Sequence, residues 1–122
     1  MVRAIRGAIT VKENESSEIY AATAELLAEM INQNAVARED LISIIFTLTP
    51  DLNACFPAKQ ARKIGYDNVP LMCMSEIGVE GALEKCIRIL IHTNSDKTLD
   101  EIKHIYLKGA SVLRPDLTKT KI

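Results

Sequence analysis

The sequence predicts a single α+β domain, with a mixed five-stranded sheet, one long helix and short helices. The chain has 122 residues, the size of one domain, and its 48% apolar content excludes disorder and allows one core. Strand-like and helix-like segments are interspersed, which favours a mixed sheet. One long helix cannot cover both faces of such a sheet, so we expect part of its apolar surface to be buried against another subunit. We expect the domain to span residues 1–117 and residues 118–122 to fray.

The first half of the chain predicts two strands separated by a long helix. Loose alternation of apolar residues predicts a strand over residues 4–11. Apolar side chains then recur at steps of three and four residues, which predicts an amphipathic helix that ends near residues 32–34. Ser16 or Ser17 is the expected N-cap of this helix. Residues 41–49, rich in isoleucine, phenylalanine and threonine, are typical of a buried strand.

The second half predicts short helices and three more strands. Pro57 suits the first position of a helix over residues 57–64, and a capping box at residues 98–101 predicts another short helix. The further strands are expected over residues 69–75, residues 86–93, and residues 105–113 as one strand or a bent pair. Pro70 indicates that the first of these strands begins there or runs along an edge.

Charge and motifs exclude several classes of function. The 15 basic and 16 acidic residues give a net charge of -1, so the footprint of a general nucleic-acid binder is missing. No apolar run approaches the roughly 18 residues of a membrane span. An odd count of three cysteines without close pairing suits a reducing cytoplasm. The sequence has no phosphate loop, dinucleotide turn, zinc-ligand spacing or nucleophile elbow, so if the protein is an enzyme, we expect it to work without metal, nucleotide or covalent nucleophile.

Arg88 is the main anomaly, because apolar residues flank it on both sides. In a strand, Ile87 and Ile89 would share one face and Arg88 would lie on the other. A buried guanidinium is costly without an anionic partner. That partner could be a glutamate such as Glu76, water at an edge position, or an anionic ligand in a cavity, and these alternatives stay open here.

Other basic residues also allow either a structural role or a role in binding an anion. Arg6 also interrupts an apolar strand, and Gly7 beside it indicates a bulge or the close approach of another backbone or a ligand. Lys59 and Arg62 would share one helix face, as solvated charges or as an anion clamp. Arginines on separate strands, with few catalytic acids or bases, suit a small polyanionic ligand, because a guanidinium binds a carboxylate through two parallel hydrogen bonds.

Seven short stretches, in their order along the chain, match a known family. They are Ile5-Arg6-Gly7-Ala8, Thr49-Pro50-Asp51-Leu52, Phe56-Pro57-Ala58-Lys59, Cys73-Met74-Ser75-Glu76, Lys85-Cys86-Ile87-Arg88, His104-Ile105-Tyr106-Leu107 and Val112-Leu113-Arg114-Pro115-Asp116-Leu117. Over essentially its whole length, the chain resembles the monofunctional chorismate mutases of the Bacillus type, the non-helical class. The resemblance implies the rearrangement of chorismate to prephenate, on the route to phenylalanine and tyrosine, without cofactor or metal. It also implies a homotrimer with a barrel-like core and active sites in clefts between adjacent subunits.

The resemblance assigns roles to five residues. Arg88 resembles the donor to the ether oxygen of the breaking C–O bond and to a carboxylate. Arg6 resembles a carboxylate clamp, and Tyr106 the tyrosine that hydrogen-bonds a carboxylate. Glu76 and Cys73 are similar to the partners of the ring hydroxyl.

Further residues are implied as walls of the site. The neighbouring wall, contributed across the interface, would consist of Phe56, Ala58, Lys59 and Arg62, and a mobile tail that covers bound ligand would include Leu113 and Arg114. Met72 departs from the family pattern, which has threonine before the cysteine, so a backbone contact there would survive and a hydroxyl contact would not.

Two other functions stay open at this point. A trimer of this kind could bind a small carboxylate metabolite without catalysis, because a fold alone does not settle function. A nucleic-acid-processing trimer is the second alternative, and the even charge balance disfavours it.

Overall fold

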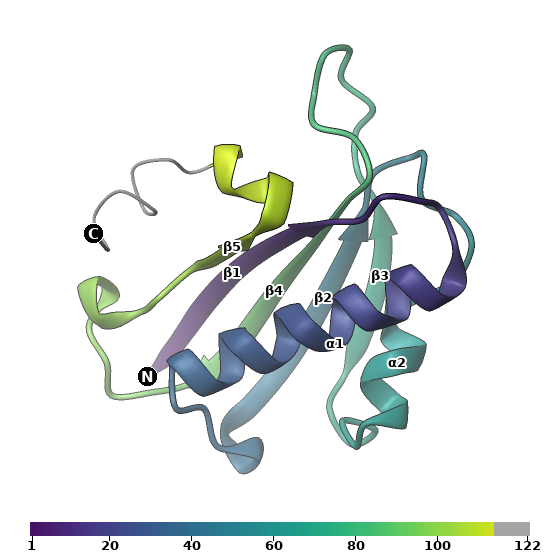
Figure 1. Cartoon of the computed structure of the whole chain (residues 1–122). Coiled ribbons are helices and arrows are strands. Elements are labelled where there is room, and N and C mark those ends of the chain that lie inside the picture. Colours follow the sequence, from purple (N-terminus) through teal and green to yellow (C-terminus); the bar gives the residue numbers. More distant parts are fainter. Residues whose placement is uncertain (114–122) are drawn as a thin grey trace.

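The computed structural model describes residues 1–113, so the predictions for Arg114 and for residues 118–122 lie outside the described residues. It contains one five-stranded sheet in the order β3-β2-β4-β1-β5 (Figure 1). The strands are β1 (Val2–Thr10), β2 (Leu41–Leu48), β3 (Leu71–Ser75), β4 (Cys86–Asn94) and β5 (Ile105–Leu107). The helices are α1 (Ser16–Gln33), α2 (Pro57–Lys63) and the 3-10 helices η1 (Arg38–Asp40), η2 (Leu99–Glu101) and η3 (Lys108–Leu113). The predicted α+β class is confirmed.

The sheet is mixed, as predicted. The central strand β4 pairs antiparallel with β1 on one side and with β2 on the other. The outer strands run parallel to their neighbours, β5 to β1 and β3 to β2. Pro70 directly precedes the edge strand β3, which confirms its expected position. Arg88 lies on β4, so the interpretation that it sits at a sheet edge is wrong.

The two faces of the sheet differ in how they are covered. Both α1 and α2 lie against one face, where the main hydrophobic core forms (Figure 1). Side chains alternate along β4, so Ile87 and Ile89 are buried in this core while Arg88 and Leu90 lie on the other side and are half-buried. We call the side of the sheet away from α1 and α2 the open face. Within residues 1–113, η3 is the element that packs against one end of it.

The predicted serine cap of α1 is wrong. The N-cap residue is Glu15, and its side chain makes no capping hydrogen bond. The Ser16 hydroxyl donates instead to the Ala54 carbonyl, which ties the start of α1 to the loop before α2. Glu18 in the first turn accepts hydrogen bonds from two backbone N–H groups upstream, and its charge suits the helix N-terminus. The Ser16 hydroxyl therefore makes a tertiary contact instead of the capping hydrogen bond that the local pattern predicted.

The strand predicted over residues 105–113 is much shorter. It ends at Leu107, and Lys108, with φ of 53°, turns the chain out of the extended region into η3. The Gly109 N–H donates to the Thr10 hydroxyl at the end of β1 (2.9 Å). This turn brings Ala110 into a small buried cluster that includes Tyr106 and closes one end of the open face.

Gly7 provides room for α1. The β1–β4 register is regular at Gly7, so the bulge interpretation is wrong. A Cβ at this position would lie 2.5 Å from the Met30 sulfur of α1 and 3.1 Å from the Ile105 carbonyl oxygen. The close approach that the sequence indicated is that of a helix and a neighbouring strand.

Replacing Gly7 with alanine should lower the free energy of unfolding by about 1–3 kcal/mol, because the new methyl group overpacks a buried contact. Urea unfolding followed by circular dichroism measures this change. Gly78→Ala is the matched control, since a Cβ there would lie 3.4 Å from Pro50, an ordinary contact. Equal stability of the two variants would contradict the close-packing role of Gly7.

Candidate active site

Three of the predicted ligand-binding side chains line one small cavity on the open face. The cavity has a volume of about 260 Å³, and Arg6, Arg88 and Tyr106 contribute to its wall. These residues come together because Ala8 of β1 pairs with Arg88 on one side and with Tyr106 on the other. Two guanidinium groups and a phenol hydroxyl in one cavity are suited to bind carboxylates.

Glu76 is brought beside Arg88 by the sheet. Its backbone N–H donates to the Leu48 carbonyl (2.8 Å), which continues the pairing of β3 with β2 for one residue beyond β3. The Glu76 side chain therefore reaches the open face, where Oε1 lies 3.2 Å from Arg88 Nε. Its second oxygen, Oε2, accepts a hydrogen bond of 2.7 Å from the Thr47 hydroxyl. The ion pair that the sequence allowed between Glu76 and Arg88 is confirmed.

The Arg88 Nε–H group is incompletely satisfied. Its nitrogen is buried, and within residues 1–113 it meets no acceptor in hydrogen-bonding geometry, although Glu76 Oε1 is 3.2 Å away. The contact is therefore an electrostatic one. A buried donor without an acceptor is unfavourable, and in a low-dielectric site it interacts strongly with an oxygen that enters. The site can stabilise negative charge on such an oxygen.

A second group of predicted residues surrounds another cavity, next to α2. Phe56, Lys59 and Cys73 line this cavity, whose volume is about 710 Å³. Pro57 begins α2 at its first turn, as predicted, and the preceding Phe56 side chain is 68% exposed. Burial raises the pKa of the Cys73 thiol, so at neutral pH it is an uncharged hydrogen-bonding group.

The two groups do not share a cavity within one chain. Cys73 packs against the main core on the helix side, whereas Glu76 reaches Arg88 on the open face. Met74 of the edge strand β3 lines both cavities. The two groups therefore lie on opposite sides of the sheet, with Met74 at the edge between them.

The remaining predicted residues occupy varied positions. Ala58 is buried in α2, and Arg62 is exposed on the same helix, where its charge opposes the rise in the pKa of Cys73. Met72 lies on β3 and is 58% exposed. Leu113, the last described residue, packs half-buried against the cluster under η3.

One residue of the site was missed. Thr47 lines the cavity with Arg88 and donates a hydrogen bond to Glu76, yet its sequence context predicted only a place in a buried strand. The signal that could have found it is register, since Thr47 pairs directly with Arg88 across β2 and β4. Cys86, on the same strand as Arg88, is fully buried, and burial raises the pKa of its thiol to about 11.

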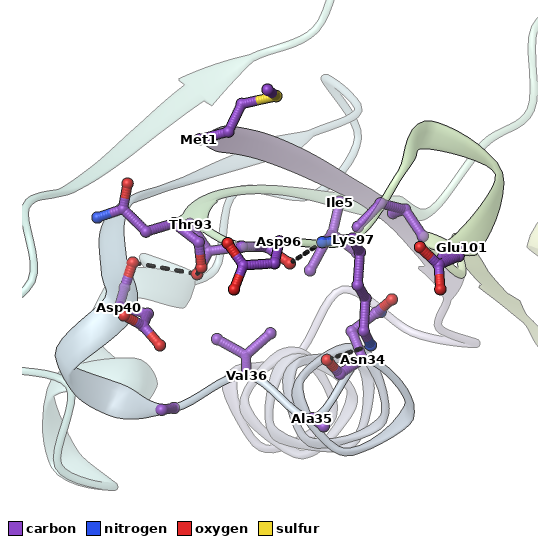
Figure 2. Close-up of a pocket in the computed structure, with 14 residues that line it drawn as sticks. Met1, Ile5, Asn34, Ala35, Val36, Asp40, Thr93, Asp96, Lys97 and Glu101 are labelled. Atoms are coloured by element: carbon purple, nitrogen blue, oxygen red, sulfur yellow. Dashed lines mark hydrogen bonds between the residues drawn. The ribbon is translucent and has the colours of Figure 1, made fainter.

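A third cavity, of about 530 Å³, lies at the far end of α1 (Figure 2). None of the predicted site residues that the structure describes lines it. Lys97 donates from Nζ to the carbonyl of Asn34, the C-cap residue of α1 (2.6 Å), and so places a positive charge at the helix C-terminus. The Thr93 hydroxyl donates to the Asp40 carbonyl in the same region (3.0 Å). These contacts give the cavity walls a structural role.

Among residues 1–113, no group of three or more histidine, cysteine, aspartate or glutamate side chains is placed to hold a metal ion. No helix in the described part of the chain has the length and apolar character needed to cross a membrane.

Fold and site together define a class: a small α+β domain with a cavity that two arginines and a tyrosine line. Comparison with known proteins makes this specific. The family model for chorismate mutase type I matches residues 2–117. The chain is 44% identical over 122 residues to chorismate mutase AroH of Bacillus subtilis (strain 168), covering 99% of this chain and 96% of the relative. It is 48% identical over 118 residues to chorismate mutase AroH of Thermus thermophilus, covering 96% and 97%.

Solved structures agree with the family model. A chorismate mutase from Clostridium thermocellum superimposes with a TM-score of 0.88 at 55% sequence identity, covering 90% of this chain and 98% of that one. The chain therefore belongs to the chorismate mutase type I family. It is an isomerase of aromatic amino acid biosynthesis, and the resemblance found in the sequence is confirmed.

Proposed function

We propose that this chorismate mutase converts chorismate to prephenate by holding the dianion in its compact conformer and stabilising the ether oxygen with Arg88. The observation that carries the proposal is the buried Arg88 Nε–H, which meets no acceptor in hydrogen-bonding geometry within residues 1–113 and lies in a cavity with Arg6 and Tyr106. An entering ether oxygen would be its missing acceptor. This arrangement supports an electrostatic role, because donors fixed before the reaction need no reorganisation when charge develops.

The chemistry needs no proton transfer. In the concerted rearrangement, the C–O bond of the ether breaks while a C–C bond forms, and partial negative charge develops on the ether oxygen. An enzyme at the low end of the usual range lowers such a barrier by roughly 8 kcal/mol. Holding the reacting ends together and stabilising the oxygen can supply this amount. Fixed arginines meet both requirements, because they can bind the carboxylates of the compact conformer and donate to the ether oxygen.

The other side chains bind and orient the substrate. Arg6 and Tyr106 share the cavity with Arg88 and are assigned to a carboxylate. Glu76 is assigned to the ring hydroxyl, as the family resemblance implies, and its carboxylate lies beside Arg88, which lines the cavity. Cys73 is assigned to the same hydroxyl from a neighbouring chain, as a neutral thiol and not as a nucleophile.

A homotrimer would complete the site. Within one chain, the α2 cavity with Phe56 and Lys59 is separate from the Arg88 cavity. The open face also presents apolar surface at its edge, where Met72 is 58% and Met74 is 44% exposed. Packing of this face against neighbouring subunits would bury that surface and place one chain's α2 wall opposite another chain's Arg88. A cytoplasmic location is part of the same proposal and agrees with three free cysteines.

The direct test of the activity is to mix the protein with chorismate and follow the loss of chorismate ultraviolet absorbance. Turnover without added metal or cofactor is the expected result. Binding of chorismate without loss of absorbance would contradict the proposal and favour a carboxylate-binding module.

Replacing Glu76 with glutamine should lower kcat about tenfold and leave the fold intact. The neutral amide weakens a charge-assisted contact to Arg88 and to the ring hydroxyl. The stability change should stay below about 1 kcal/mol, because the two side chains are 38% and 17% exposed and the ion pair is partly solvated. Initial rates of chorismate loss and thermal melting measure the two effects.

The matched control is Glu25→Gln, which removes the acidic partner of the exposed Lys108–Glu25 pair (3.5 Å). This control should keep full activity. Unfolding of the Glu76→Gln variant under conditions where the wild type is stable would show instead that the Glu76 pair is structural.

A further inference from the structure

We propose that Thr47 is a positioning residue for the reaction: its hydroxyl orients the Glu76 carboxylate so that one oxygen faces Arg88. This inference rests on the proposed roles of Glu76 and Arg88. Thr47 lies on β2, a strand with no function predicted from its sequence.

One hydrogen bond and one ionic contact divide the two carboxylate oxygens of Glu76 between two partners. Thr47 Oγ1 donates to Glu76 Oε2 over 2.7 Å, and Glu76 Oε1 lies 3.2 Å from Arg88 Nε. The terminal torsion of a glutamate is broad and has no strong rotamer preference of its own. The Thr47 hydroxyl therefore supplies the constraint that fixes the plane of the carboxylate.

Thr47 is a rigid point of attachment. It pairs directly with Arg88 between β2 and β4, and its own strand continues to Leu48, whose carbonyl holds the Glu76 backbone N–H. The β-branched side chain of threonine has few rotamers, so its hydroxyl is held by the sheet. Both partners of Glu76 are thus fixed on neighbouring strands, independently of the loop that follows β3.

The surroundings make this hydroxyl hard to replace. The Glu76 side chain is 17% exposed, and Thr47 lines the same 260 Å³ cavity as Arg88. A hydrogen bond to a charged group in such a half-buried place is stronger than one at the surface. Loss of the hydroxyl would let the carboxylate rotate and would shift the Arg88 guanidinium relative to the ether oxygen. That contact strengthens as the C–O bond breaks, so the loss should appear in kcat more than in KM.

The test compares Thr47→Val with Thr47→Ser. Valine keeps the shape of the side chain and removes the hydroxyl, and we expect kcat to fall about tenfold while KM changes less than about twofold. Serine keeps the hydroxyl and should restore most of kcat. A Thr47→Val enzyme with kcat within about twofold of the wild type, or a Thr47→Ser enzyme as slow as Thr47→Val, would overturn the inference.

The matched control is Thr93→Val on β4, which removes a threonine hydroxyl that donates to the Asp40 carbonyl at the far end of the sheet. This control should lose stability and keep kcat. A second comparison adds Thr47→Val to a Glu76→Ala background, where no carboxylate is left to orient. We expect almost no further loss of kcat there, whereas a full tenfold loss would show that Thr47 acts independently of Glu76 and would refute the inference.

The same assays separate this inference from the proposed function. An Arg88→Ala enzyme that retains activity would refute the proposed function and the role of Thr47 with it. An inactive Arg88→Ala enzyme together with a fully active Thr47→Val enzyme would refute the role of Thr47 alone.

Discussion

Replacing Arg88 with alanine should lower kcat by about a hundredfold to a thousandfold. This is the usual cost of removing one preorganised donor from a developing oxyanion, about 3–4 kcal/mol. Arg88 is the donor whose buried Nε–H meets no acceptor in hydrogen-bonding geometry within residues 1–113. The initial rate of chorismate loss at saturating chorismate measures the effect.

Two further variants test whether the loss of kcat depends on the guanidinium group at position 88. Arg88→Lys keeps the charge and loses the planar fork, so its kcat should lie between those of the alanine variant and the wild type. Arg38→Ala removes an exposed guanidinium that stacks 4.4 Å from the centre of the Tyr66 ring, and it should keep full activity. A loss of less than about tenfold for Arg88→Ala would show that another group stabilises the ether oxygen.

Mixing two inactive variants should restore activity. One variant carries Arg88→Ala on the open face, and the other carries Lys59→Ala and Arg62→Ala on α2. Each variant alone has one defective wall in every site. In mixed oligomers, an intact Arg88 from one chain meets an intact α2 wall from another at about one quarter of the interfaces, so about one quarter of the wild-type activity should return.

The control for this experiment combines Arg88→Ala with Arg6→Ala. Both residues line the same cavity of one chain, so every site in that mixture contains a defective arginine wall. No recovery is expected there. Activity that stays absent from the Arg88 and α2 mixture, after mass measurement has shown mixed oligomers, would contradict a site shared between subunits.

Much of the fold could be predicted because local patterns and tertiary structure agree. The alternation of side chains along the strand predicted Arg88 on the face opposite to that of Ile87 and Ile89, and the structure has this arrangement. Pro70 before β3 and Pro57 in α2 lie where their missing N–H groups are tolerated. The capping box at η2 formed because both of its partners are local.

The errors arose where a distant contact determined the local structure. Ser16 lost its capping role to the Ala54 carbonyl, 38 residues away along the chain. The predicted strand after residue 107 is the 3-10 helix η3 instead, and the Gly109 N–H of this helix donates a hydrogen bond to the Thr10 hydroxyl. Gly7 is explained by Met30 of α1, which no local pattern around Gly7 indicates.

The candidate site was predicted in part. The sequence indicated an anion for Arg88 and named Glu76 as one partner, and the ion pair between them is present. Spacing could not show that Thr47 completes this arrangement, because it depends on the register of β2 against β4. Alternation along β3 could have shown that Cys73 and Glu76, three residues apart, lie on opposite sides of the sheet, and this observation supports a shared site.

The most direct test of the account is a crystal structure of the protein with a dicarboxylate mimic of the bicyclic transition state. The account predicts that the Arg88 guanidinium donates to the ether oxygen of the mimic, with Arg6 and Tyr106 from the same chain and α2 from its neighbour around one ligand. A mimic contacted by a single chain, or an Arg88 guanidinium turned away from the ether oxygen into solvent, would contradict it.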